Sequence, residues 1–90
     1  YYFHPHSVDL ARAFQDELLE ELRLRDLGIG RSNLALVRPT WMPSALTETM
    51  YLMIPRQEAA LRDPSVQERI ARAHLRALET FARGRAEARR

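Results

Sequence analysis

The stretches SNLALVRP, residues 32–39, and PSALTET, residues 43–49, decide the expected fold class of this chain. Each contains a short segment that we interpret as a strand, 34–37 in the first and 44–47 in the second. Each of these segments lies between turn-forming or charged residues. Short runs of this kind are typical of strands covered on both faces of a sheet. Pro43 opens the second run, at a position where a strand needs no backbone donor. We therefore expect two interior strands, with Glu48 at the end of the second.

An amphipathic helix is predicted before these runs. Ser7 suits the N-cap position, and Asp9 follows in the first turn, where the helix dipole favours negative charge. Gly28 stands after a charged turn and is typical of a helix stop, so the helix should end near Asp26. Its apolar face is formed by Leu10, Ala11, Phe14, Leu18 and Leu22.

A longer helix is predicted after the Asp63-Pro64 turn, and the segment from Arg83 onward is predicted to be a solvated, fraying end. Helical periodicity is carried by Val66, Ile70, His74, Ala77, Leu78 and Phe81. The order helix, strand, strand, helix is typical of an α/β fold, with helices packed on a mostly parallel sheet in an α/β/α layered arrangement.

The expected sheet is incomplete. Two or three short strands leave an unpaired edge and uncovered apolar helix faces. The chain opens with Tyr1-Tyr2-Phe3, which has the composition of a buried strand and no initiator methionine, so we expect a fragment of a larger domain. A homodimer through the exposed edges is a further expectation.

The composition is that of a folded domain, with 46% apolar and 29% charged residues among ninety. Cysteine is absent, which excludes disulfides, thiolate nucleophiles and cysteine-ligated zinc. All fourteen basic residues are arginine, yet the net charge of +2 is too small to indicate a nucleic-acid partner. No apolar run approaches the roughly 18 residues of a membrane span, so no membrane partner is expected.

Glu48 is the first candidate for chemistry because ligands of α/β sheets gather at the carboxyl ends of strands. A solvated glutamate at a strand end, or one that caps a neighbouring helix, is the alternative that the pattern leaves open. Arg38 ends the first run and is predicted to bind a carboxylate of the substrate. Its alternative role is an ion pair with an acidic neighbour.

The segments NLALVR, residues 33–38, and MPSALTET, residues 42–49, resemble the end of the bacterial zinc-dependent N-acetylmuramoyl-L-alanine amidases of the amidase type 3 family. YFHP, residues 2–5, with the following Ser7, is similar to that family's step from strand to helix. The resemblance covers nearly all of the chain. Matching positions farther along are Asp26, Gly28, Pro55, Leu61, Gln67, Ile70, Ala71 and Phe81.

This resemblance implies a sheet between helices and one zinc ion, held by two histidines and a glutamate that lie earlier in the domain. The ligands would then belong to a missing N-terminal half, which is the expected partner of this segment, and this chain would supply no metal ligand. Residues 1–83 would be the C-terminal part of the catalytic domain and 84–90 a basic tail. The chain alone would be inactive.

The resemblance also implies a role for Glu48, which matches the family's catalytic glutamate. That residue accepts a proton from the zinc-bound water and passes it to the leaving amine. The substrate would be peptidoglycan, cut between the lactyl group of N-acetylmuramic acid and L-alanine. The expected location is the cell envelope, periplasmic or extracellular.

The loop after Glu48 departs from the family pattern. Met50 stands where a glycine is usual, although Tyr51 keeps the aromatic residue that follows. Met53 and Ile54 replace a frequent serine and asparagine, so the substrate contacts of this loop are expected to differ.

Other polar and aromatic residues have simpler expected roles. His4 and His6 are not expected to bind a metal, because two histidines alone make an incomplete site, and His74 is expected on an apolar helix stripe as a hydrogen-bonded, partly buried side chain. Trp41 and Met42 are predicted to cover the strand ends, with a groove beside Glu48 as the alternative. Arginines 69, 72 and 76 are predicted to form a solvated helix face.

A second function stays open at this stage. The apolar helix faces could dock on a partner protein, which would make the chain a small interaction module without catalytic activity, with Glu48 incidental. An upstream histidine, glutamate and later histidine would favour the amidase.

Overall fold

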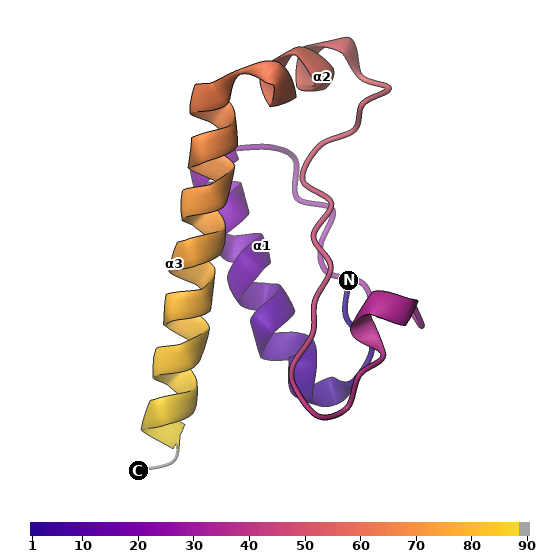
Figure 1. Ribbon diagram of the computed structural model, residues 1–90, viewed down its shortest axis with the longest axis vertical. Coiled ribbons are helices and arrows are strands. Elements are labelled where there is room, and N and C mark those ends of the chain that lie inside the picture. The colour runs from indigo at the N-terminus through magenta and orange to yellow at the C-terminus, as the bar shows by residue number, and fades with distance from the viewer. Residues whose placement is uncertain (89–90) are drawn as a thin grey trace.

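The computed structural model describes residues 1–88 of the chain and is mostly helical. Helices α1 and α3 lie side by side, α2 crosses near one end of the pair, and the rest of the chain runs in extended form beside α1 (Figure 1). The elements are the 3-10 turn η1 Pro5–Ser7, α1 Val8–Leu22, the 3-10 turn η2 Ala35–Val37, α2 Pro55–Arg62 and α3 Pro64–Ala88.

Helix α1 begins as the sequence predicts but ends earlier. Ser7 occupies the N-cap position, although its side chain makes no capping hydrogen bond to the helix. At the other end Arg23 takes a left-handed conformation, with φ 52°, and its N–H donates to the Leu19 carbonyl. This αL cap closes the helix at Leu22, short of the predicted end near Asp26.

Small side chains bring α1 and α3 together. Ala73 and Ala77 of α3 are fully buried, and Leu10, Ala11 and Leu18 of α1 are buried too. Alanine lets the two helix backbones approach closely, since it adds little volume between them. The stripe predicted for α1 is part of this core, whereas the one predicted for α3 is only partly right: Ala73 was not among its positions, and Leu78, which was, is 49% exposed.

Arginines of α3 pair with glutamates of α1 beside this core. Arg69 Nε lies 2.8 Å from Glu21 Oε1, while Arg76 bridges Glu17 at 2.9 Å and Glu21 at 3.0 Å. Both arginine side chains stay largely solvated, as predicted, but their pairing with α1 was not predicted. Arg72 pairs within α3, with Glu68.

The prediction of an interior strand at 34–37 is wrong. The Val37 N–H donates to the Leu34 carbonyl, which closes a 3-10 turn, and Pro39 follows shortly after. Val37 is fully buried but Leu36 is 71% exposed, so the run is covered on one side only. Among residues 1–88 no neighbouring strand offers this run a ladder of hydrogen bonds, and the local turn satisfies its backbone instead.

The second run is extended, but it is not part of a named strand within residues 1–88. Leu46 and Tyr1 exchange both backbone hydrogen bonds, as in an antiparallel pair. The segment that contains Tyr1 also pairs on its opposite edge, where Tyr2 forms a parallel bridge with Arg31. The described residues therefore hold three paired backbone segments in place of the expected sheet.

The C-terminal end of α3 is longer than predicted. The helix continues past Gly84 to Ala88, where a fraying end was expected, and its last residues are exposed. Residues 89 and 90 of the predicted basic tail lie outside the described residues. No helix within 1–88 is long and apolar enough to cross a membrane.

The packing of α1 on α3 predicts that Ala73→Leu destabilises the protein. The larger side chain overpacks a fully buried site, which costs about 1–3 kcal/mol in the free energy of unfolding. Urea unfolding followed by circular dichroism measures this loss. Ala71→Leu on the exposed side of the same helix is the control, and an equal loss in both variants would contradict the packing.

The ion pairs predict a dependence of stability on acid. Hydrogen bonds from Arg69, then Arg76, lower the pKa of Glu21 below its ordinary value. Because this pKa is lowered by folding, its stabilising contribution is complete above the ordinary pKa and is lost as the pH falls through the lowered one. Glu21→Gln should therefore be less stable at neutral pH and lose less stability on acidification.

The exposed Glu20, one position earlier, provides the control for this measurement. On acidification, Glu20→Gln should lose as much unfolding free energy as the unmodified protein does. Urea unfolding at several pH values measures both losses. An undiminished acid-induced loss in Glu21→Gln would show that the pairs do not link the helices.

Candidate functional site

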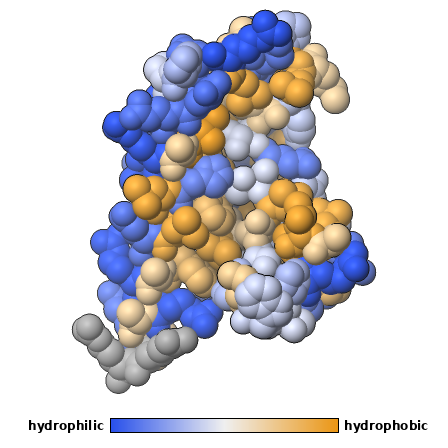
Figure 2. All heavy atoms as spheres, viewed as in Figure 1, coloured by the Kyte–Doolittle hydropathy of each residue, from blue (hydrophilic) through white to orange (hydrophobic). Residues whose placement is uncertain are grey.

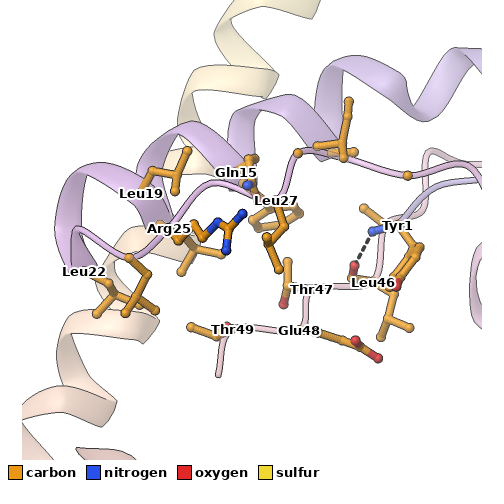
Figure 3. A pocket seen from close by; sticks show the side chains of 18 of the residues that line it. Tyr1, Gln15, Leu19, Leu22, Arg25, Leu27, Leu46, Thr47, Glu48 and Thr49 are labelled. Atoms are coloured by element: carbon orange, nitrogen blue, oxygen red, sulfur yellow. Dashed lines mark hydrogen bonds between the residues drawn. The ribbon is translucent and has the colours of Figure 1, made fainter. Parts of the chain in front are cut away.

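A cavity of about 470 Å³ lies between α1 and the extended segment 45–49. One wall is the leucine face of α1, and the turn that follows this helix forms the rim (Figure 3). Glu48 belongs to the opposite wall, together with its neighbours Thr47 and Thr49. The cavity is thus mainly apolar with a few polar groups, as small-molecule sites are.

The carboxylate of Glu48 is available for chemistry. The side chain is exposed and makes no hydrogen bond or ion pair with any residue in the range 1–88. It leaves the segment in a different direction from the Thr47 side chain (Figure 3). Glu48 thus lines a cavity from an extended segment, where a strand was expected, and its catalytic role stays a prediction.

Two contacts at the start of this segment hold it in place. The Ser44 N–H donates to Ser7 Oγ at 2.9 Å, and Ser7 is fully buried. Leu46 follows with its two bonds to Tyr1, at 2.7 and 2.9 Å. The hydroxyl predicted to cap α1 thus holds the segment that leads to Glu48.

His74 provides a third contact, from α3. Its Nε2 lies 2.9 Å from Thr47 Oγ1, and its Nδ1 lies 2.8 Å from the Ile70 carbonyl. The Phe14 ring of α1 packs against the imidazole, with ring centroids 5.1 Å apart. The prediction that His74 is a hydrogen-bonded, partly buried side chain is confirmed, but its link to the neighbour of Glu48 was not predicted.

Arg25 is a cation that the sequence did not single out. It stands in the charged turn after α1, lines the cavity and has its side chain beside Leu27 (Figure 3). Asp26, next to it, is occupied elsewhere: hydrogen bonds from Gln15 and then from the Gly28 N–H lower the pKa of its carboxyl group. In the sequence, Arg25 was only one charged residue at the end of a helix, and many helices end in this way.

Arg38, Trp41 and Met42 do not line this cavity. Arg38 is exposed just after η2, and Trp41 is 80% exposed and Met42 45% exposed. In residues 1–88, Trp41 and Met42 therefore neither cover strand ends nor line the cavity beside Glu48.

The two N-terminal histidines bind backbone carbonyls. Nε2 of His4 lies 2.6 Å from the Arg38 carbonyl, and Nε2 of His6 lies 3.4 Å from that of Met42. A carbonyl can only accept, so both nitrogens donate. The stacked imidazoles, 5.5 Å apart, therefore hold the loop after η2 to the N-terminal segment.

The described residues do not fit a zinc site. No three histidine, cysteine, aspartate or glutamate side chains within 1–88 are grouped so that they could hold a metal ion. Zinc in proteins needs three or four such ligands.

Comparison with protein families gives a match to the family described as N-acetylmuramoyl-L-alanine amidase, over residues 1–80. No curated protein and no solved structure gives a significant match. The family is an α/β family of zinc amidases, and a mostly helical segment 1–88 in which no metal-binding group is found is consistent with a fragment of such a domain. Because the match spans most of its length, the chain belongs to the N-acetylmuramoyl-L-alanine amidase family.

Proposed function

We propose that residues 1–83 are the C-terminal part of a peptidoglycan amidase domain, followed by a basic tail at 84–90. The complete domain cleaves the amide between the lactyl group of N-acetylmuramic acid and L-alanine of the stem peptide. One observation carries this proposal: within the family match, the residue that resembles the catalytic glutamate lies on the wall of a cavity.

Glu48 is the general base in this proposal. Its carboxylate accepts a proton from the water that attacks the scissile carbonyl, and the protonated form then delivers that proton to the leaving amine of L-alanine. The C–N bond breaks as the new C–O bond is retained, so atoms and charge balance. The absence of a protein partner for this carboxylate within 1–88 leaves it available for both transfers.

Zinc in the complete domain is proposed to be held by upstream residues, since those described here do not form a site. This chain contributes the base and one wall of the cavity. It is therefore inactive as a separate piece, and its first partner is the rest of its own domain.

Exposed apolar surface supports a missing partner of this kind. Figure 2 shows hydrophobic side chains grouped along α3 and over the extended segments beside it. Strongly exposed examples are Leu36, Leu52, Met53 and Leu75, at 71%, 72%, 87% and 56%. We propose that the upstream part of the domain covers these groups, and that a homodimer of the separate chain is the alternative.

The proposed location is the cell envelope, periplasmic or extracellular, because peptidoglycan lies there. The family match supports a cell-wall role.

The role of Glu48 predicts that Glu48→Gln in the complete domain abolishes hydrolysis while bound zinc is unchanged. Removal of a general base costs roughly 10²–10⁴-fold in kcat. Release of muropeptide products by chromatography and zinc content by elemental analysis measure the two effects. Glu79→Gln, at an exposed carboxylate of α3, is the control and should be fully active. An active Glu48→Gln enzyme would remove Glu48 from the mechanism.

Arg38 is proposed to bind a carboxylate of the stem peptide outside the cavity. The stem peptide extends beyond the scissile amide, so the carboxylate proposed for this contact is one distant from the amide, at an exposed cation that does not line the cavity. Arg38→Gln should raise KM several-fold and leave kcat unchanged, because the contact is equal in the ground and transition states. Arg56→Gln on α2 is the matched control, and equal KM values for the two variants would rule out this contact.

A further inference from the structure

The backbone around Glu48 is poorly fixed by its own hydrogen bonds. Leu46 is the last residue before it that pairs through its backbone, and Tyr51 is the next, with its N–H 2.7 Å from Gln57 Oε1. Between these two residues no backbone hydrogen bond exists within the described part of the chain. A general base needs a defined position to act, so another contact must supply it.

The Thr47–His74 hydrogen bond is the contact nearest to Glu48. It joins partly buried side chains 27 residues apart, at 2.9 Å. The Ile70 carbonyl can only accept, so Nδ1 of His74 carries a proton. In the neutral ring Nε2 then has a lone pair, and the Thr47 hydroxyl donates to it.

The imidazole itself is held by both long helices. His74 follows the fully buried Ala73 on α3, and Phe14 of α1 packs against the ring at 5.1 Å. Its second nitrogen is bonded to the carbonyl one turn earlier on α3. The ring is therefore a fixed acceptor at the contact of two packed helices, and it determines where Thr47 lies.

We propose that His74 is a positioning residue for Glu48. Through the Thr47 hydroxyl it fixes the segment against α3, so that the next residue, Glu48, is held at the wall of the cavity. This inference rests on the proposed role of Glu48 as the base. It assigns His74 no contact with substrate or metal.

Paired substitutions at Thr47 separate positioning from simple packing. Thr47→Val keeps the shape and removes the hydroxyl, so kcat of the complete, zinc-loaded domain should fall by about 10- to 100-fold with little change in KM. Thr47→Ser keeps the hydroxyl and should stay within about 3-fold of the unmodified enzyme. A packing role requires the reverse order, with the valine variant the more active, and that order would overturn the proposal.

His74→Phe provides an independent test, since it keeps a ring beside Phe14 and removes both nitrogens. It should lower kcat as much as Thr47→Val, and the double variant should be no slower than either single one, because both remove the same contact. Fully additive losses would overturn the proposal. ¹⁵N NMR of the unmodified protein should show His74 protonated on Nδ1, and protonation on Nε2 alone would also overturn it.

The Glu48→Gln variant distinguishes this inference from the proposed function. If Glu48→Gln is inactive and Thr47→Val keeps full kcat, the positioning role is wrong and the base is unaffected. If Glu48→Gln is active, the proposed function fails, and with it the reason for positioning this residue.

Discussion

The packing of α1 against α3 is the contact on which the rest of the described structure depends. Ala73 and Ala77 add little volume, so the two helices approach closely, and arginines of α3 bind glutamates of α1 at the edge of this contact. Phe14 and His74 meet within the same pair of helices. The segment that carries Glu48 is then attached to this pair through Thr47 and to the N-terminus through Leu46. A rigid pair of helices thus supports a segment with few hydrogen bonds of its own.

The helices could be predicted from the sequence and the strands could not, for a physical reason. An amphipathic helix makes its backbone hydrogen bonds internally, so the apolar spacing from Leu10 to Leu22 indicates it directly. A strand needs a partner to pair with, and a four-residue apolar run does not reveal whether one is present. Residues 35–37 therefore form a 3-10 turn, while Leu46 pairs only with Tyr1. The end of α1 was missed because Arg23, a residue with no special preference for it, adopts the left-handed cap.

The candidate site was predictable only where its signal was local. Glu48 was singled out from its place after an apolar run, and the structure adds a cavity beside it. The Thr47–His74 bond joins residues far apart in the chain, and the cavity position of Arg25 depends on how the turn after α1 folds back, so neither had a local signal. Ser7 illustrates the same limit, since its hydroxyl was expected at the helix cap and binds Ser44 instead. The family match assigns no role to any of these residues.

In the function proposed above, Glu48 is the base of an amidase domain whose metal is bound by other residues. A crystal structure of the complete, zinc-loaded domain with a non-hydrolysable muramoyl-peptide analogue tests it most directly. The Glu48 carboxylate should then lie within hydrogen-bonding distance of the scissile amide or of one intervening water, with Thr47 still bound to His74. A structure in which Glu48 faces away from the bound analogue, and another carboxylate occupies that position, would contradict it.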